Sequence, residues 1–256
     1  TEAGRAFHER CVQLLADLEE AEASAGAGTT VPRGTLRVSG PVTFGVAHLA
    51  PAVADFVARF PDVRADVELS DRIVDLVDEG FDAAVRIGPL AGPNLVGRRV
   101  GESRLVCCAA PAYVRRHGEP RTPGDLARHA CLLYQYAPQR DVWTFADRKG
   151  APQRVRVAGP VHANNGAFLS ALAVAGLGIA YEPDFIVGPD LQAGRLVPLL
   201  RPYAAAVTPI HVVYASRRHL SAKVRAFADF LQQRFAQPAW ALAPDPAPAP
   251  RGATRR

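Results

Sequence analysis

The sequence is most informative at first through what it lacks. Its 256 residues include no methionine and only four cysteines, and aromatic residues make up 7%. The cysteines form no CxxC pair and show no metal-ligand spacing with the seven histidines. No apolar run reaches the roughly 18 residues that a membrane-spanning helix needs. We therefore expect buried free thiols in a reducing cytoplasm, no metal and no membrane segment. The missing initiator indicates a processed chain or one cut from a longer protein.

The overall composition is that of a folded chain with a mild basic excess. Hydrophobic residues are 48%, charged residues 21% and the formal net charge is +5. These values exclude disorder and a collagen-like fibre, and the length allows one to two domains. The Ala/Pro-rich tail at 238–256 carries +2 of that charge, so the body has only +3. Lys149 and Lys223 are the only lysines. The arginine excess suits phosphate recognition, and a GC-rich coding bias explains it equally well.

Motifs of enzymatic chemistry are missing as well. There is no G-K-[ST] phosphate loop, no H-E-x-x-H and no G-x-S-x-G, and no carboxylate pair lies in an acid/base context. Gly176 and Gly178 begin a dinucleotide-type glycine pattern, but Tyr181 stands where its third glycine belongs. His48 is either a structural histidine, which we favour, or a base. The sequence therefore predicts no enzyme and no cofactor.

The N-terminal segment carries apolar residues at alternating steps of four and three. That spacing is typical of helices that pair in coiled coils. The positions are Phe7, Cys11, Leu14, Leu18, Ala21 and Ala25. Gly26, Gly28 and Pro32 end the pattern. We interpret 1–30 as a linker or dimerisation helix, with a helix packed on its own domain as the alternative.

From Thr35 the pattern changes to alternating strands and helices. Leu36 and Val38 predict a strand, and further elements follow in β-α-β order. They are a helix over 49–60, a strand over 63–69, a short helix over 73–77 and a near-continuous apolar strand over 81–87. Such an apolar strand is typical of a sheet covered on both faces, so a mostly parallel α/β sheet is expected.

The same pattern begins again after Gly101. Thr122 and Asp125 form a capping box, and Ser221 is the expected cap of the last helix. The predicted strands are 104–109, 130–136, 154–158, 177–181 and 210–214. The predicted helices are 111–117, 168–175 and the segment after Ser221. Two similar α/β lobes are the simplest arrangement.

Polar residues gather where these strands end. In open α/β sheets, ligands bind outside the carboxyl ends of the strands, where helix N-termini offer free amides. The strand-end residues expected to bind a ligand are Pro41, Thr43, Ser70, Arg86, Tyr134, Gln135, Asn164, Asn165 and Tyr181. Ser39, Asp71 and Glu182 stand beside them. We expect the set to converge on a cleft between the lobes.

Arg86 is the most specific of these residues because it interrupts an apolar strand. An arginine there must reach solvent, bind an anion or pair with a carboxylate such as Asp71. The hydroxyls of Thr43 and Ser70 could equally cap helices. Asn164 and Asn165 are also suited to a turn.

The order of motifs resembles one family closely. The resemblance rests on GTLRVSGPVTFGVAHLAPAVADFVARFPDVRADVELSD, DLVDEGFDAAVRIG, RLVCCAAPAYVRRHG, AVAGLGIAYEPDF and GRLVPLL. These runs are similar to the effector-binding region of LysR-type transcriptional regulators, from about Gly34 to Phe235. The heptad segment resembles the end of that family's linker helix. The N-terminal winged helix-turn-helix of the family has no counterpart here.

The resemblance implies an α/β fold of two Rossmann-like lobes of the type II periplasmic-binding-protein kind, joined by two crossover strands and preceded by the linker helix. Lobe I would take 33–102 plus 209–237, and lobe II 103–208, with a disordered tail at 238–256. A small molecule, often a carboxylate, would bind between the lobes.

By motif, the effector would contact Thr43 or Pro41, Ser70 and Arg86 from lobe I, and Tyr134 and Gln135 from lobe II. Pro41 departs from the hydroxyl-rich form of the first turn. The implied partners are a homodimer or homotetramer and DNA, the latter through the absent N-terminal domain. The cytoplasm is the implied location.

The sequence is compatible with two other classes of protein. A solute-binding receptor of the same fold would carry a signal peptide and no heptad helix. An enzyme on this fold would need a phosphate loop or a cofactor-bearing cysteine. The heptads at 1–25 argue against the first alternative, and the absent motifs argue against the second.

Overall fold

The computed structural model describes residues 31–90, 95–147, 149–215, 220–238 and 240, together with Thr1, Gly4, Phe7 and Cys11. The predicted heptad helix and the Ala/Pro tail therefore lie almost wholly outside the described residues. The chain divides into two compact units. Unit 1 holds the described residues of Thr1–Glu102 and Pro209–Pro238, and unit 2 those of Ser103–Thr208 and Ala239–Arg256. The strands β4 (Leu95–Ala109) and β12 (Val207–Ala215) carry the chain from one unit to the other.

The sheet of unit 1 is mostly parallel. Its strands are β1 (Gly34–Gly40), β2 (Val63–Leu69), β3 (Ala83–Ile87) and the unit 1 part of β12. They follow the order β12-β3-β1-β2, in which β1 pairs parallel with β2 and β3, and β12 pairs antiparallel with β3. The carboxyl ends of β1, β2 and β3 therefore meet at one edge of the sheet. The predicted parallel arrangement of these three strands is confirmed.

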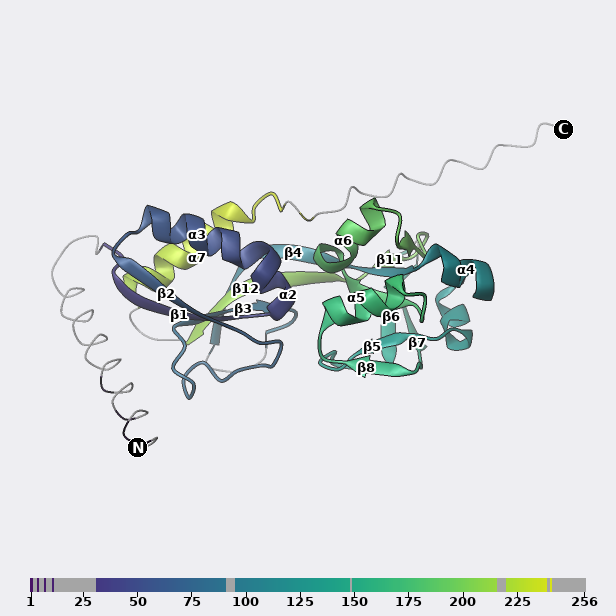
Figure 1. Ribbon diagram of the computed structural model, residues 1–256, viewed down its shortest axis with the longest axis horizontal. Helices are drawn as coiled ribbons and strands as arrows, with labels where there is room; N and C mark the ends of the chain where they lie inside the picture. The colour runs from purple at the N-terminus through teal and green to yellow at the C-terminus, as the bar shows by residue number, and fades with distance from the viewer. Residues whose placement is uncertain are drawn as a thin grey trace. The chain divides into compact units, whose positions relative to one another are not determined.

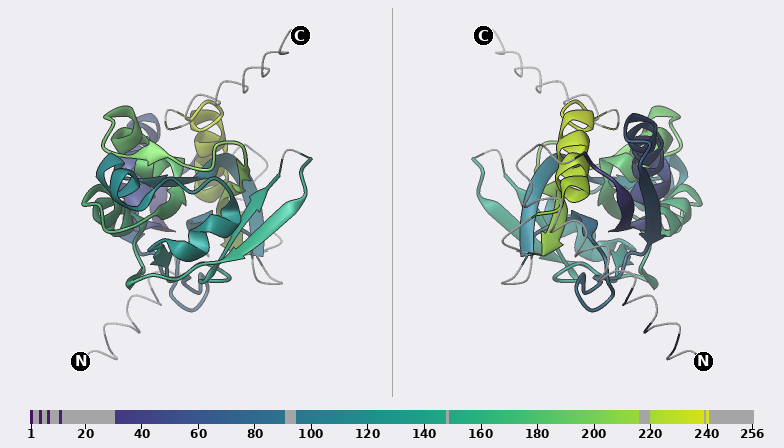
Figure 2. Two further views of the ribbon diagram at one scale, coloured as in Figure 1. Left: turned by 90° about the vertical axis from the view of Figure 1, so that its right-hand side faces the viewer. Right: turned by 90° about the vertical axis from the view of Figure 1, so that its left-hand side faces the viewer.

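Helices cover one face of this sheet. The first helical run is continuous and consists of α2 (Val42–Phe44), the π-helical η1 (Gly45–Leu49) and α3 (Ala50–Arg59). The last helix, α7 (Ala222–Arg234), begins at the predicted cap, Ser221, whose hydroxyl accepts from the Val224 N–H. The rings of Phe56 and Phe227 lie 5.2 Å apart, and this contact packs α3 against α7 on the same face (Figures 1 and 2).

A loop over 70–82 covers the opposite face. Val74, Leu76 and Phe81 are buried from the loop against Ala84 and Val213 of the sheet. The loop thus supplies the second apolar layer that a strand as apolar as β3 requires.

The short helix predicted over 73–77 is wrong, because 73–75 adopt no regular structure and a turn runs over 76–80. The Asp75 carboxylate accepts from the N–H groups of Val77 and Asp78, and Glu79 accepts from the Asp75 N–H. Side-chain oxygens therefore take the amides that a helix would bond to its own backbone.

Unit 2 contains three groups of paired strands. The unit 2 part of β4 pairs antiparallel with β9 (Ala180–Pro183) and β10 (Val197–Pro198). A parallel pair is formed by β5 (Leu132–Tyr134) and β8 (Val161–Ala163). The third group is the hairpin of β6 (Val142–Ala146) and β7 (Pro152–Arg156), extended by β11 (Ala204–Ala205), and the left-hand view of Figure 2 shows this hairpin.

The helices of unit 2 begin and end mostly as local sequence signals indicate. They are α4 (Pro111–His117), the 3₁₀ helix η2 (Pro123–Arg128), α5 (Gly166–Val174) and α6 (Asp184–Gln192). Gly118 ends α4 with φ 82°, a conformation that glycine adopts without strain. Thr122 and Asp125 form the predicted capping box of η2. The sequence pattern missed α6, in which burial of successive residues removes the helical period.

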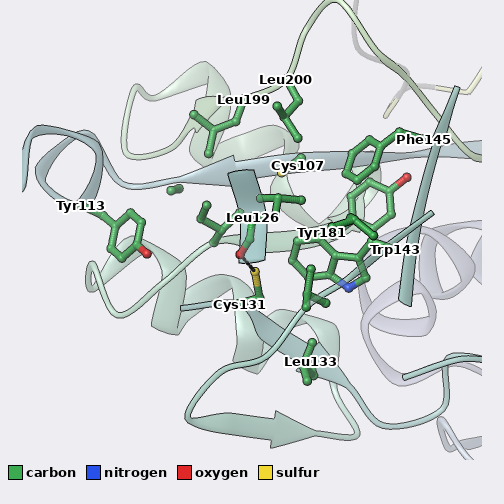
Figure 3. Packing of buried hydrophobic residues seen from close by; sticks show 14 of the residues in the cluster. Cys107, Tyr113, Leu126, Cys131, Leu133, Trp143, Phe145, Tyr181, Leu199 and Leu200 are labelled. Carbon is green, nitrogen blue, oxygen red and sulfur yellow. Dashed lines mark hydrogen bonds between the residues drawn. The ribbon is translucent and has the colours of Figure 1, made fainter. Parts of the chain in front are cut away.

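The main core of unit 2 is aromatic and sulfur-rich. Tyr181 of β9 packs between Trp143 and Phe145 of β6, with ring centroids 5.1 and 4.9 Å away (Figure 3). Cys107 and Cys131 belong to the same buried cluster. No helix of the described residues is both long and apolar enough to cross a membrane.

Candidate functional site

The carboxyl ends of the parallel strands in unit 1 bring together most of the residues predicted there. Pro41 follows β1 and precedes the helical run 42–59, while Ser70 follows β2. The Ser70 N–H donates to the Gly40 carbonyl at 2.8 Å, which continues the β1–β2 pairing to the strand ends. Thr43 lies within α2 and is not its N-cap. These residues form one polar edge at the start of a helix, where a ligand of an α/β sheet is expected.

A carboxylate of the chain itself occupies this helix start. The Val42 N–H donates to Asp71 Oδ1 at 3.0 Å. Because the N-terminus of a helix attracts negative charge, Asp71 takes a position that an anionic ligand could otherwise use. The sequence placed Asp71 beside the site as a candidate partner of Arg86. In the structure, the Asp71 carboxylate accepts from the first amide of α2 instead.

Arg86 forms no ion pair with any described residue. Its Nη1 donates to the Arg72 carbonyl at 3.4 Å, and its Nη2 is buried without a hydrogen-bond partner. Burial lowers the pKa of the guanidinium, the Glu79 charge raises it and the Arg72 charge lowers it. An arginine remains cationic in any case. The structure thus presents a half-buried cation with one donor group unused.

The loop above Arg86 is held by its own charge pair. Both guanidinium nitrogens of Arg72 donate to the Glu79 carboxylate, at 2.9 and 2.7 Å. This bidentate geometry is the strong form of an arginine–carboxylate contact. The Ser70 hydroxyl accepts from the Arg72 N–H at 3.2 Å, a short turn rather than a helix cap. The pair fixes the backbone at 72, and that backbone carbonyl in turn holds Arg86.

Unit 2 has its own polar strand edge. Tyr134 ends β5 and pairs with Ala163 at the end of β8, and the Gln135 N–H donates to the Ala163 carbonyl at 2.8 Å. Asn164 and Asn165 follow directly. Asn165 Oδ1 accepts from the Phe168 N–H at 3.0 Å and so caps α5, while Asn164 is exposed in the turn. Four of the five residues predicted in this lobe therefore lie together.

Glu182 brings a second internal carboxylate to a helix start. Its side chain is buried and lies against Gly166, where an added Cβ would stand 2.5 Å from Oε2. Gly166 is the first residue of α5. A carboxylate of the chain therefore stands beside the first residue of the predicted ligand-facing helix in each unit. The signal in the sequence was an acidic residue two positions after the end of one strand, Asp71, and within another strand, Glu182.

Tyr181 lies apart from the polar edge of unit 2. Its hydroxyl donates to the Thr144 carbonyl at 2.8 Å and accepts from the Ala206 N–H at 3.3 Å. Burial raises the pKa of this phenol to about 12. We leave Tyr181 out of the proposed ligand set because its hydroxyl serves two backbone groups of its own core.

The described residues offer little for covalent or metal chemistry. No group of three metal-ligating side chains is found among them. Cys107, Cys108 and Cys131 are free and buried, as predicted, and burial raises the pKa of each thiol. Burial lowers the pKa of His48, whose ring lies 5.3 Å from that of Phe44. These groups are suited to packing rather than to nucleophilic catalysis.

The chain forms two α/β units linked by two strands, and each unit has polar residues and the start of a helix at its strand ends. This arrangement defines a ligand-binding domain of the periplasmic-binding-protein class. The comparisons with known proteins identify the family. The family model of the LysR substrate binding domain matches residues 29–236. The chain belongs to this family, and the fold predicted from the resemblance is confirmed.

The relatives are transcription regulators. A Haemophilus influenzae protein described as an uncharacterised helix-turn-helix-type transcriptional regulator is 39% identical over 224 residues, which cover 88% of this chain and 77% of the relative. The regulator DmlR of Escherichia coli is 32% identical, covering 93% of this chain and 77% of DmlR. The prediction of a transcription regulator rather than an enzyme agrees with these names.

Solved structures of LysR-type regulators have a similar fold. The CrgA regulatory domain of Neisseria meningitidis, a LysR-type regulator, is 31% identical with a TM-score of 0.69, covering 80% of this chain and 100% of that domain. The full-length Vibrio cholerae virulence activator AphB is 26% identical with a TM-score of 0.70, covering 92% of this chain and 80% of AphB.

Proposed function

We propose that this chain is the effector-binding domain of a LysR-type regulator and that it recognises a small anionic molecule, such as a carboxylate, through Arg86. The observation that carries the proposal is the buried Nη2 of Arg86, which has no hydrogen-bond partner among the described residues. A buried donor on a cation is costly unless a partner satisfies it. Asp71 and Glu182 already stand at the two helix starts. Arg86 is thus the cationic group left for an effector.

The effector would act by shifting populations. A ligand changes a conformational equilibrium only by its differential affinity for the two states. In this proposal the chain works as a cytoplasmic homodimer or homotetramer. Effector binding would favour one arrangement of the units or of the subunits, and so alter how helix-turn-helix domains preceding this region meet DNA. The strand-end residues Pro41, Thr43, Ser70, Tyr134, Gln135, Asn164 and Asn165 would line the effector.

Thermal unfolding with and without ligand tests the proposal. The wild-type chain would be heated with acetate, succinate or inorganic phosphate, with each probe titrated at constant ionic strength. A probe at 100 times its dissociation constant is expected to stabilise the fold by about 2.7 kcal/mol. Arg86→Ala should abolish this stabilisation while the unliganded protein stays folded.

Arg64→Ala provides the matched control, because Arg64 is an exposed arginine on β2 of the same unit. It should bind the probe like the wild type. If Arg86→Ala kept the full ligand-induced shift, the assignment of Arg86 would be wrong.

A further inference from the structure

The positive charge of the chain is concentrated in one stretch of unit 2. Residues 111–158 contain nine arginine or lysine and four aspartate or glutamate residues, so their net charge is +5. Residues 1–110 contain 11 basic and 16 acidic residues, a net charge of −5. Such an asymmetry along a chain indicates a polyanionic partner more specifically than the overall basic excess does.

Three elements of unit 2 carry this charge, and they lie against one another over one core. They are α4, η2 and β7. The Tyr113 hydroxyl of α4 accepts from the Ala130 N–H at 3.0 Å just beyond η2, and η2 lies against β7. Tyr113, Leu126 of η2 and Val155 of β7 belong to the same buried cluster (Figure 3). The side chains that these elements turn away from the core therefore form one continuous surface.

The arginines on this surface are exposed. They are named the basic face here and consist of Arg115, Arg116, Arg121, Arg128, Arg154 and Arg156. Among the described residues, the only ion pair of the basic face joins Arg156 to Asp141, and the Arg156 side chain is 83% exposed. The Asp125 carboxylate accepts from the N–H groups of Arg121 and Thr122 in the capping box. With Glu119, Asp125 and Asp141 as the acidic residues beside it, the basic face keeps a net charge of +3.

Several arginines of unit 1 are neutralised by partners within the unit. Each of four makes an ion pair, and the pairs are Arg37–Asp66, Arg72–Glu79, Arg98–Asp229 and Arg234–Asp55. Like charges that gather without such partners repel one another and destabilise the compact state. A bound polyanion would remove this repulsion from the basic face.

The chemistry of the basic face favours a nucleic-acid backbone as the polyanion. Guanidinium groups match the geometry of phosphate and are weakly hydrated, and a duplex presents phosphates along its whole length. A protein partner would need aromatic or aliphatic anchors at the centre of its interface. No large apolar side chain of α4, η2 or β7, all of which the structure describes in full, is exposed.

We propose that the basic face of unit 2 binds the phosphate backbone of DNA without reading its sequence. The proposal rests on the proposed function in one respect, since helix-turn-helix domains preceding this region would bring DNA close to the chain. It does not depend on Arg86 or on the effector. Binding at the basic face would add to the affinity of those domains, because a second contact on the same DNA is effectively intramolecular.

Fluorescence anisotropy of a labelled DNA duplex of unrelated sequence, titrated with the whole chain, tests the basic face. Each guanidinium that neutralises one phosphate contributes about −0.9 to the slope of log K against log salt, so between about 50 and 200 mM salt the wild-type slope should lie between about −3 and −5. Arg121→Gln combined with Arg154→Gln should make the slope shallower by about 2 and weaken binding about tenfold at the lowest salt. This double variant should melt at or above the wild-type temperature, because it reduces repulsion.

The matched control is Arg33→Gln combined with Arg64→Gln, which removes the same charge from exposed arginines of unit 1. It should keep the wild-type slope, and so should a variant with Arg251, Arg255 and Arg256 of the tail changed to glutamine.

The proposal would be wrong if the wild type bound no DNA at the lowest salt, or if either control weakened binding as much as the basic-face variant did. Poly-L-glutamate is the comparison for an acidic protein. If it bound as tightly as DNA and lost as much affinity in the basic-face variant, the face would serve an acidic protein and the proposal would again be wrong. None of these results changes the effector proposal, which the ligand titration of Arg86→Ala decides by itself.

Discussion

The buried ion pair between Lys223 and Asp82 gives the clearest stability prediction. Lys223 Nζ donates to the Thr35 carbonyl at 2.7 Å and lies 3.2 Å from Asp82 Oδ2. The two side chains are only 5% and 12% exposed, so solvent does not screen the pair. Asp82 Oδ2 also accepts from the Arg37 N–H at 2.8 Å. One pair thus ties α7 to β1 and to the residue before β3.

Lys223→Met should strongly destabilise unit 1. The substitution removes the cation and leaves the Asp82 carboxylate buried with a single backbone donor, an imbalance that costs about 3–5 kcal/mol. For chains of this size 1 kcal/mol shifts the midpoint by about 2–4 °C, so a fall of about 6–20 °C is expected. Differential scanning calorimetry measures it and separates the transitions of the two units if they unfold independently.

Two further variants determine whether charge imbalance is the cause. Lys223→Met combined with Asp82→Asn should be more stable than Lys223→Met alone, because an amide oxygen still accepts from Arg37 and no unpaired charge remains. Arg156→Ala breaks an exposed ion pair with Asp141, in which the Arg156 side chain is 83% exposed. This variant should lower the free energy of unfolding by less than about 1 kcal/mol. A loss under 1 kcal/mol for Lys223→Met, or no gain in the double variant, would refute the reasoning.

Two shorter predictions concern unit 2. Asn165→Ala removes the side-chain cap of α5 and should lower the free energy of unfolding by about 1 kcal/mol in a denaturant titration. Asn165→Asp should keep the cap and most of this free energy. Equal losses in both variants would contradict the capping role. Cys107 and Cys131 should resist a thiol-specific reagent at pH 8 until the chain is unfolded. The reason is that burial raises the pKa of each thiol, that of Cys131 to about 12. Rapid modification of either thiol in the native protein would contradict this prediction.

The sequence predicted the parallel sheet of unit 1 because its signals there are local and agree. The alternation in β2 and the apolar run of β3 needed no information from elsewhere in the chain. Helix ends with strong caps were also accessible, such as Gly118 and the capping box at Thr122. Each of these features depends on residues within about one turn of one another.

Two elements were predicted wrongly because their structure depends on interactions that apolar spacing does not reveal. The loop over 70–82 has helical apolar spacing, but the side chains of Asp75 and Glu79 take its amides. The helix α6 is buried on successive residues and carries Pro189 in its interior, so no amphipathic period marks it. Periodicity alone could detect neither outcome.

Part of the candidate site could also be predicted from local sequence signals. Arg86 was identifiable because a cation interrupts an apolar strand, and the Asn164–Asn165 turn was identifiable from its residue types. That Asp71 bonds the Val42 amide instead of Arg86, and that the hydroxyl of Tyr181 serves two backbone groups, depends on register and tertiary packing.

A crystal structure with the carboxylate that binds most tightly in the titrations tests the central claim most directly. The account predicts a carboxylate oxygen about 3 Å from Arg86 Nη2. A carboxylate bound away from Arg86, with only water at Nη2, would contradict it.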